Sequence, residues 1–529
     1  MSNILKSFFN KLPVGSSRIY PYHALAKQRI LDHQKRMFEA AELGRSIPKE
    51  KYEAELPKLR SRLVQAQLAL KQTQSQVVII ISGVDGAGKG EVVHRLNEWL
   101  DPRGVDTHAF GTPSDEERER PFFWRFWRTM PSRGRLGIFF GSWYTDPIIR
   151  KVYGETDTGE LDVALKRICS TERMLAEDGT VFLKLWLHLS EKAQYQRLSD
   201  LEKNPHTHWR VLPTDWKHHK LYSKFEKTAE RVIRLTDTEH APWHIIESTD
   251  NRHRDLTAGR LLADALESVI EGRALKRSRK QPLPKVKPTT NGDKTILDRV
   301  DLEQEIPDRK YRKRLAKHQS EWNRLVWEAH EKKISNVIVF EGWDASGKGS
   351  SIRRVTEAMD ARLYQIIPVA APTDEESAQH YLWRFWRHLP RDGRVTIFDR
   401  SWYGRILVER VEGYANTEEW MRAYHELNDF EEQLAEHGIV LHKFWIHISK
   451  EEQLERFKKR ELVPYKRYKI TDDDWRNRKK WDIYKAAVND MVAHTSTGVA
   501  PWTIIPGNDK RFARVQILKT LTERLEKAL

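Results

Sequence analysis

"NVIVFEGWDASGKGSS", residues 336–351, joins a short apolar run to a glycine-rich turn. Val337, Ile338 and Val339 favour a β-strand, and the turn after them ends in Gly-Lys before a stretch of helical character. This order places backbone N–H groups at a helix N-terminus, where they can bind phosphate. Position 349 is glycine, although nucleotide-binding versions of the loop carry a Ser or Thr there as a magnesium ligand. The stretch predicts a phosphate-binding loop whose metal is held by other residues.

The same loop occurs a second time. "SGVDGAGKGE", residues 82–91, contains Lys89, which lies 259 positions before Lys348 (348 − 89). Longer phrases repeat at this offset, such as "FFWRFWRTMPSRGR" and "YLWRFWRHLPRDGR". Four tryptophan pairs share it: Trp124 and Trp383, Trp143 and Trp402, Trp216 and Trp475, and Trp243 and Trp502. An offset held without a gap over such a distance indicates duplication of a whole domain.

The duplication divides the chain of 529 residues, which is too long for one ordinary core. We predict an N-terminal extension at 1–50, a first domain at 51–272, a linker at 273–300 and a second domain at 301–529. We predict that this extension has no counterpart in the second copy. The linker is basic, contains proline and has few large apolar residues, as is typical of an exposed connection.

Each copy alternates apolar runs with amphipathic stretches. In the second copy the predicted strands are "NVIVFEG", "YQIIPVAAP", "RVTIFDR", "VLHKFWIHI" and "PWTIIPG". Apolar runs joined through helices predict a parallel sheet that is covered on both faces. The fold class is therefore α/β, with two tandem P-loop kinase-like domains related by internal duplication.

Composition restricts the class of partner and the compartment. The net charge of +16 predicts an anionic partner. The single cysteine, Cys169, excludes an intramolecular disulfide and a thiolate metal cluster. No apolar stretch approaches the roughly 18 residues that cross a bilayer, and the first residues lack a signal-like segment. We expect a cytoplasmic protein without a membrane partner.

Charged residues around the second loop suggest a phosphoryl-transfer site. Lys348 supplies positive charge to phosphate, and Arg400 and Arg405 follow the third predicted strand. Asp344 within the loop and Asp399 at the end of "VTIFD" are candidate ligands for one hard cation, replacing the missing hydroxyl. The backbone cradle is expected to comprise Gly342, Ser346, Gly347 and Gly349.

A cationic segment follows the fourth strand of the second copy. Residues 456–485 hold twelve Lys or Arg, against six in the equivalent residues 197–226. P-loop kinases carry a mobile lid at this place in the fold, and the lid closes over phosphates. The charge density favours a lid that binds a polyanion.

"GWDASGKG", "FDRSWYGR" and "PYKRYKITDDDW" together resemble the polyphosphate kinase 2 family, and the tandem arrangement is similar to its two-domain AMP-phosphorylating members. The resemblance implies phosphoryl transfer from inorganic polyphosphate to AMP, with Mg²⁺ as cofactor. It implies that Asp344 orients the attacking AMP phosphate, that Asp399 holds the metal, and that the charge of the transferred group is stabilised by Lys348 and Arg400. Its candidate lid contacts are Arg456, Lys466, Arg467 and Lys469.

The first copy departs from this pattern. It keeps Asp85, Gly88 and Lys89. The positions of Asp399, Arg400, Arg405, Lys466 and Arg467 are occupied in the first copy by Phe140, Gly141, Asp146, Thr207 and His208. We predict that the second domain is catalytic and that the first is structural, supporting an interface or tethering polyphosphate.

Two other functions suit parts of the sequence. An ATP-dependent nucleoside monophosphate kinase would use the same fold and loop, although Gly349 argues against it. A non-catalytic polyanion binder, for instance of nucleic acid, would use the positive charge, but the paired Asp344 and Asp399 make little sense without a metal. We expect no nucleic-acid partner. Nucleobase preference, polyphosphate length, direction and oligomeric state stay open, with a homo-oligomer one possibility.

Overall fold

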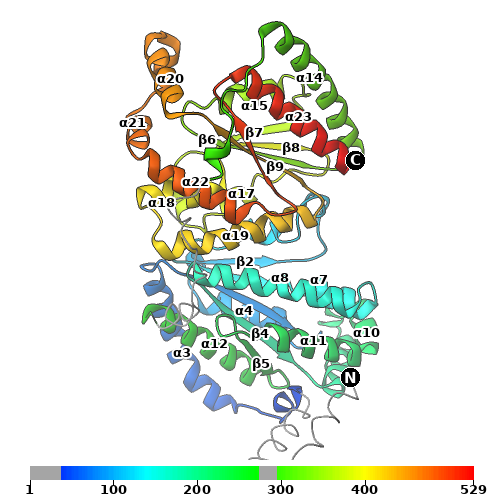
Figure 1. The fold of residues 1–529 in the computed structure, drawn as a ribbon. Helices are drawn as coiled ribbons and strands as arrows, with labels where there is room; N and C mark the ends of the chain where they lie inside the picture. The colour runs from blue at the N-terminus through cyan, green and yellow to red at the C-terminus, as the bar shows by residue number, and fades with distance from the viewer. Residues whose placement is uncertain (1–36, 273–294) are drawn as a thin grey trace, which may run out of the picture.

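The chain forms two lobes, one from each copy of the repeat (Figure 1). A computed structural model describes residues 37–272 and 295–529. Most of the predicted extension and linker lies outside these residues, as do the side chains of Lys466 and Lys469. Within the described residues, no helix is long and apolar enough to cross a membrane.

The first lobe is built on a parallel sheet of five strands in the order β2-β3-β1-β4-β5. Its strands are β1 (Gln76–Gly83), β2 (Val105–Ala109), β3 (Leu136–Phe140), β4 (Thr180–His188) and β5 (Trp243–Glu247). Its α-helices are α3 (Lys49–Leu70), α4 (Lys89–Trp99), α5 (Asp115–Arg118), α6 (Trp124–Trp127), α7 (Thr145–Tyr153), α8 (Thr158–Glu177), α9 (Glu191–Lys203), α10 (Pro213–Lys220), α11 (Tyr222–Thr236) and α12 (Asn251–Ile270). Helices η1 (Met37–Ala41), η2 (Pro102–Gly104) and η3 (His208–Arg210) are short 3₁₀ turns.

The second lobe repeats this topology, with the strand order β10-β9-β6-β8-β7 and every pair parallel. Its strands are β6 (Asn336–Gly342), β7 (Tyr364–Pro368), β8 (Val395–Asp399), β9 (Val440–His447) and β10 (Trp502–Pro506). Its α-helices are α14 (Asp308–Glu331), α15 (Lys348–Thr356), α16 (Asp374–Ser377), α17 (Trp383–Trp386), α18 (Val408–Glu412), α19 (Thr417–Glu436), α20 (Lys450–Leu462), α21 (Asp472–Lys479), α22 (Trp481–Thr495) and α23 (Lys510–Ala528). Its 3₁₀ turns are η4 (Leu297–Arg299), η5 (Trp402–Ile406) and η6 (Pro464–Lys469). The predicted α/β fold and all five predicted strands are confirmed.

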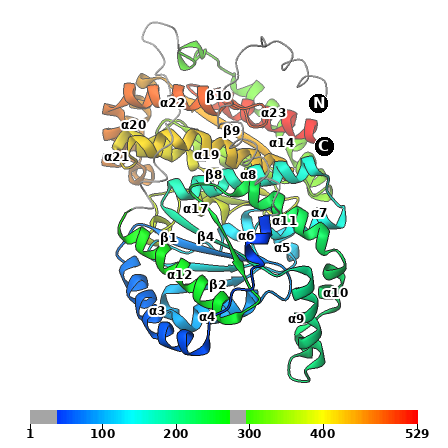
Figure 2. The ribbon, with the colours of Figure 1, turned by 90° about the horizontal axis from the view of Figure 1, so that it is seen from below.

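Each sheet is buried on both faces, which explains why its central strand is a continuous apolar run. In β6 the side chains of Val337, Ile338, Val339 and Phe340 are all fully buried. Helices α3 and α12 cover one face of the first sheet (Figure 2), and α14 and α23 cover the equivalent face of the second. The parallel strands end at the edge of the sheet where the phosphate loops begin, as is usual for ligand sites in such folds.

The equivalence of the two copies extends upstream of residue 51. Phe38 in η1 and Leu297 in η4 are 259 positions apart, and so are Ile47 and Ile306; all four are buried. Phe38 stacks on His188 of β4, with ring centroids 4.4 Å apart. The residues just before the first long helix therefore belong to the packed unit of each lobe.

The lobes meet through equivalent surfaces. Trp127 stacks on Trp386 at a centroid distance of 5.6 Å, and the Ser170 hydroxyl donates to the Asp429 carboxylate; each pair is related by the 259-residue offset. Helices α8 and α19, which carry Ser170 and Asp429, face each other across the boundary (Figure 1). Contact of a residue with its own counterpart is the mark of a two-fold arrangement. One chain thus contains an interface of the kind found in a symmetric dimer.

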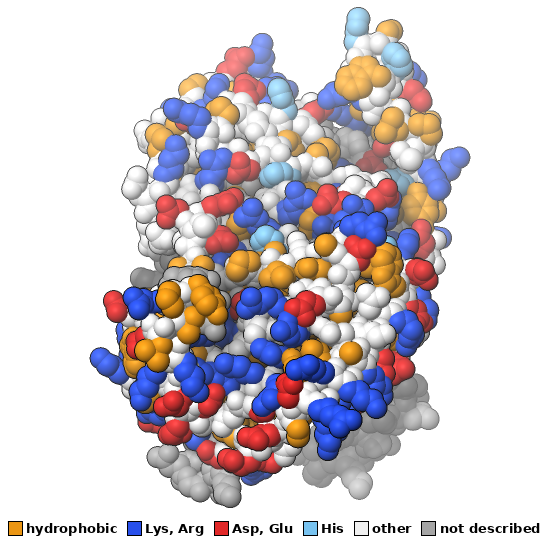
Figure 3. Space-filling view, turned by 90° about the horizontal axis from the view of Figure 1, so that it is seen from above, with side chains coloured by type: hydrophobic (Ala, Val, Ile, Leu, Met, Phe, Trp, Pro, Cys, Tyr) orange, Lys and Arg blue, Asp and Glu red, His pale blue; other side chains and the backbone are white. Residues whose placement is uncertain are grey.

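Basic residues do not form one uninterrupted patch on the face drawn in Figure 3. Lys and Arg side chains are spread over it, with Asp and Glu side chains between them. The net charge alone therefore does not locate a site, and the local geometry of the loops has to do so.

Candidate active site

The second phosphate loop connects β6 to α15 and is shaped by two glycines. Gly342 has φ of +150°, and a Cβ atom there would lie 2.6 Å from the backbone oxygen of Ile446. Gly347, with φ of +114°, is the residue that precedes α15. Only glycine adopts these conformations without strain. Lys348 Nζ donates to the backbone oxygens of Gly342 (2.7 Å) and Trp343 (3.2 Å), so its ammonium group lies over the loop. The Ser346 side chain is buried within the turn.

The carboxylate of Asp399 lies beside the start of α15. Asp399 ends β8, and its backbone pairs in register with Phe340 of β6. A Cβ atom on Gly349 would be 3.9 Å from Asp399 Oδ2. The carboxylate therefore stands close to the place where the usual Ser or Thr would begin. It makes no hydrogen bond or ion pair with another residue in the described part of the chain, so its oxygens are available to a cation.

Asp344 connects the loop to two other segments. Its Oδ1 accepts from Arg400 Nη2 at 3.2 Å, and its Oδ2 accepts from Asn477 Nδ2 of α21 at 2.9 Å. Its backbone oxygen accepts from Gln453 Nε2 of α20 at 3.1 Å. The loop is thereby tied to the predicted lid through neutral amides, as well as to Arg400.

Charges of both signs surround the loop lysine. Desolvation lowers the pKa of Lys348 and Arg400 lowers it further, while neighbouring carboxylates, first that of Asp344, oppose the shift. Desolvation also disfavours the charge of Arg400, but the Asp344 carboxylate and its neighbours raise the pKa of this guanidinium. Burial raises the pKa of Glu341, which accepts a hydrogen bond from Ser401 Oγ at 2.8 Å. The site holds several charges at close range; Glu341 is buried and Lys348 partly buried, while the Arg400 side chain is 56% exposed.

Arg400 adopts a backbone conformation that is unfavourable for its residue type. Its φ is +66°, and its counterpart in the first copy is Gly141, with φ of +76°. A residue with a Cβ atom costs about 1–2 kcal/mol in this left-handed region. Strain retained in a non-glycine residue beside a phosphate loop is typical of functional positions.

The variant Arg400→Gly distinguishes the contribution of this side chain to catalysis from the backbone strain that it causes. We expect the variant to lose about a hundredfold in phosphoryl transfer, because a cation is removed from the transferred group. Its thermal midpoint should stay equal to or above that of the parent, because glycine relieves the strain. Steady-state rates and thermal unfolding of Arg400→Gly and Arg400→Ala measure both effects. Equal destabilisation of the two variants would contradict the strain argument.

Two predicted phosphate contacts, Arg456 and Arg405, already bind other groups of the protein. Arg456 is only 3% exposed, and its guanidinium donates to the backbone oxygens of Ala345 (3.0 Å), Ser346 (2.7 Å) and Gly507 (2.6 Å). It supports the loop from behind and does not present its charge to a ligand. Arg405 bonds to Glu409 at 2.9 Å and lies over the Tyr381 ring.

The predicted lid, residues 456–485, comprises most of α20, the turn η6, α21 and the start of α22. Arg467 is exposed in η6 and donates to the backbone oxygen of Glu461. The predicted contacts Lys466 and Lys469 are in the same turn, but their side chains fall outside the description. Among the other lid cations, Arg476 pairs with Glu412 at 3.2 Å and Lys480 with the same carboxylate at 2.9 Å. Part of the lid charge is thus used within the protein.

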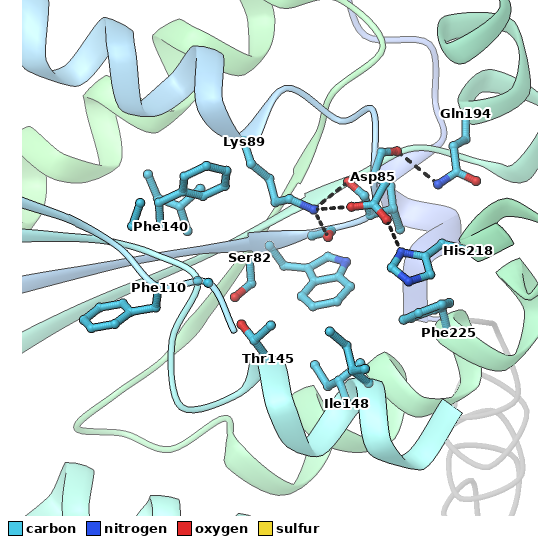
Figure 4. A pocket seen from close by; sticks show the side chains of 18 of the residues that line it. Ser82, Asp85, Lys89, Phe110, Phe140, Thr145, Ile148, Gln194, His218 and Phe225 are labelled. Carbon is cyan, nitrogen blue, oxygen red and sulfur yellow. Dashed lines mark hydrogen bonds and ion pairs between the residues drawn. The ribbon is translucent and has the colours of Figure 1, made fainter. Parts of the chain in front are cut away.

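The first copy forms a similar loop with different electrostatics. Lys89 Nζ donates to Asp85 Oδ1 at 2.9 Å, and His218 Nδ1 lies 2.6 Å from Asp85 Oδ2 (Figure 4). Burial disfavours the ionised form of Asp85, but Lys89 and His218 outweigh it and lower the pKa of this carboxyl. At the positions of Asp399 and Arg400 stand Phe140 and Gly141. This loop lacks both the free carboxylate and the additional cation.

A protein-family model described as polyphosphate kinase 2 matches the chain twice, over residues 46–273 and 305–529. The chain belongs to the polyphosphate kinase 2 family. The matched residues include both phosphate loops, together with Asp399 and Arg400. The sequence-based assignment to this family is confirmed.

Individual relatives agree with this membership over nearly the full length. A polyphosphate:AMP phosphotransferase of Pseudomonas aeruginosa is 50% identical over 93% of this chain and 99% of its own. One of Acinetobacter johnsonii, with the same name, is 38% identical over 88% of this chain and 95% of its own. A crystal structure assigned to polyphosphate kinase 2 of P. aeruginosa superposes with a TM-score of 0.84 at 48% identity, covering 93% of this chain and 99% of that one.

Proposed function

We propose that the protein transfers the terminal phosphoryl group of inorganic polyphosphate to AMP, giving ADP and a polyphosphate shorter by one unit, in its C-terminal domain. The observation that carries this proposal is the set of four charged groups around the second loop, Asp344, Lys348, Asp399 and Arg400, of which the first copy keeps only two. The donor and the acceptor are taken from the names of two relatives, polyphosphate:AMP phosphotransferases that this chain matches over nearly their whole length.

In the proposed reaction an oxygen of the AMP phosphate attacks the terminal phosphorus of polyphosphate. The bond from that phosphorus to the bridging oxygen breaks, and the bridging oxygen stays with the shortened chain. Lys348 and Arg400 stabilise negative charge on the transferred group. Asp344, held by Arg400 and Asn477, orients the acceptor side of the loop. Holding both polyanions in one geometry supplies much of the rate gain.

Asp344 and Asp399 fit a magnesium ion in this reaction. Mg²⁺ is commonly bound through one or two carboxylates, with substrate phosphates and waters completing its six positions. Among the described residues, no group of three or more His, Cys, Asp or Glu side chains is placed to hold a metal ion. The carboxylate of Asp399, which lies beside Gly349 and has no partner among the described residues, is the feature that favours a shared site. When bound, the ion would neutralise charge on the phosphates.

The lid supplies the remaining positive charge to the donor. Polyphosphate is a linear polyanion, so its binding requires several cations and should weaken with salt. We assign this contact to the exposed Arg467 of η6; the other two predicted contacts, Lys466 and Lys469, have side chains outside the described part of the chain. Arg456 supports the loop backbone from behind.

The donor is tested directly by measuring ADP formation from AMP and Mg²⁺ with either long-chain polyphosphate or ATP as the only donor. We expect turnover with polyphosphate and at least a hundredfold less with ATP. Raising the salt concentration should increase the KM for polyphosphate more than that for AMP, because more charges are involved. Turnover with ATP alone would make the protein an ATP-dependent nucleotide kinase and contradict the proposed role of the lid.

A further inference from the structure

A pocket of about 350 Å³ lies beside the phosphate loop of the first domain. Its size falls within the range of about 300–1,000 Å³ that is usual for small-molecule sites. Apolar and aromatic side chains form most of its wall, and Figure 4 shows them around a central space. The lining residues include Val84, Phe110, Phe140, Ile148, Tyr222 and Phe225.

The comparison of the two domains explains why space exists here. In the second domain the residues equivalent to Val84 and Tyr222 are Trp343 and Trp481, whose rings stack 3.7 Å apart and nearly parallel. In the first domain Val84 is much smaller than an indole. Tyr222 donates its hydroxyl to the backbone oxygen of Leu189 at 2.7 Å, which holds its ring in the wall. The indole of Trp343 in the second domain therefore has no equivalent in the first domain.

The same comparison shows that the pocket has lost charge. The second domain places Glu341, Asp399 and Arg400 around its loop. The equivalent residues of the first domain are Ser82, Phe140 and Gly141. The charges that stay, Lys89 and Asp85, neutralise each other at 2.9 Å. A polyanion would find little net positive charge here, whereas an uncharged molecule would lose little hydration.

The polar side chains that remain in the pocket can form hydrogen bonds with an uncharged ligand. The hydroxyl groups of Ser82 and Thr145 point into the central space in Figure 4. Thr145 Oγ1 accepts from the backbone N–H of Ser142 at 3.1 Å, which leaves its own hydrogen to donate to a ligand. His218 lies at one side, oriented by Asp85. A few fixed polar groups in an apolar wall are the usual composition of a specific small-molecule site.

We propose that this pocket binds an uncharged heteroaromatic molecule of nucleoside size, with its rings against Phe110, Phe140 and Ile148 and its polar groups toward Ser82 and Thr145. The first domain is then a ligand-binding unit in its own right. This inference goes beyond the proposed function, because it concerns binding in a domain that we do not consider catalytic.

The test is calorimetric titration of the full chain with adenosine, comparing the parent with Val84→Trp, which restores the indole of the second domain. We expect saturable binding to the parent and at least tenfold weaker binding to Val84→Trp. Val499→Trp, the same change at a side chain that is 56% exposed, is the matched control and should bind like the parent. Thermal unfolding checks that each variant is folded. Phe225→Glu, which puts a charge into the pocket, replaces Val84→Trp if that variant does not fold, with the same loss expected.

Three results would overturn the proposal. The first is the absence of adenosine binding to the parent up to millimolar concentrations. The second is equal binding to the parent and to the filled or charged variants, which would place adenosine in the other domain. The third is a loss of inorganic polyphosphate binding in Val84→Trp with adenosine binding unchanged, which would make the pocket an anion site. Because the readout is binding, none of these depends on which donor the catalytic domain uses.

Discussion

Lys348→Ala should lower kcat/KM for AMP phosphorylation by about a thousandfold. The ammonium group lies over the loop, with bonds to Gly342 and Trp343, and is held among several charges in a desolvated setting. A preorganised donor in such a site commonly contributes a factor of about 10²–10³. Loss of its bonds to the loop carbonyls should also misplace the backbone groups that bind phosphate. Steady-state kinetics with polyphosphate as donor measures the effect.

The duplication supplies a matched control for this prediction. Lys89 occupies the equivalent position in the first domain, but there it pairs with Asp85 beside a pocket that lacks the other catalytic charges. Lys89→Ala should change the rate less than twofold. Comparable losses in the two variants would show that both domains carry out the reaction, and the division of labour would have to be abandoned.

The fold was predictable because its signals are strong and repeated. Each central strand is an apolar run ended by glycine, as in β6, which ends at Gly342. Such a run can be satisfied only by burial on both faces of a sheet. Because the offset between the copies is constant, an element predicted in one copy can be checked against the equivalent residues of the other. What sequence did not reveal was the contact of Trp127 with Trp386, since "WRFW" shows aromatic residues but not their partners.

The site was predictable in its charges but less so in its geometry. Arg456 lies in a cationic segment, which predicts a phosphate contact, but the structure buries its guanidinium against loop carbonyls. One signal could have pointed to this. The first copy, which keeps only two of the four charged groups, also has arginine at this position, Arg197, which pairs with Glu91 at 2.9 Å. An arginine that is present beside both loops need not be a contact specific to the proposed reaction.

Neutral partners were missed for a related reason. Asn477 and Gln453 both donate hydrogen bonds to Asp344. They lie in a segment rich in lysine and arginine, and a prediction based on charge does not select neutral amides. Glu341 precedes the loop and is buried, which a sequence does not show. These groups position the charged residues, and only the packing of α20 and α21 against the loop reveals them.

Asp399→Asn should reduce turnover by about a hundredfold to a thousandfold while leaving the protein folded. The carboxylate has no partner among the described residues, so an amide of the same shape should hardly change the thermal midpoint. The same lack of a partner makes it the best placed group for a shared cation, and an amide is a weaker ligand for Mg²⁺. We expect the activity of the variant to require a higher Mg²⁺ concentration, measured as rate against free Mg²⁺.

The affinity of Asp399→Asn for polyphosphate is a second measurement that tests the role of the carboxylate. In the absence of Mg²⁺, removal of a negative charge beside a polyanion should leave the affinity for polyphosphate unchanged or increase it, because repulsion is reduced. A variant that binds at least as well but turns over slowly distinguishes a catalytic carboxylate from one that shapes the binding site. Phe140→Asn, the equivalent change in the first domain, should affect neither property. Full activity of Asp399→Asn would contradict the proposed metal site and favour a reaction supported by Lys348 and Arg400 alone.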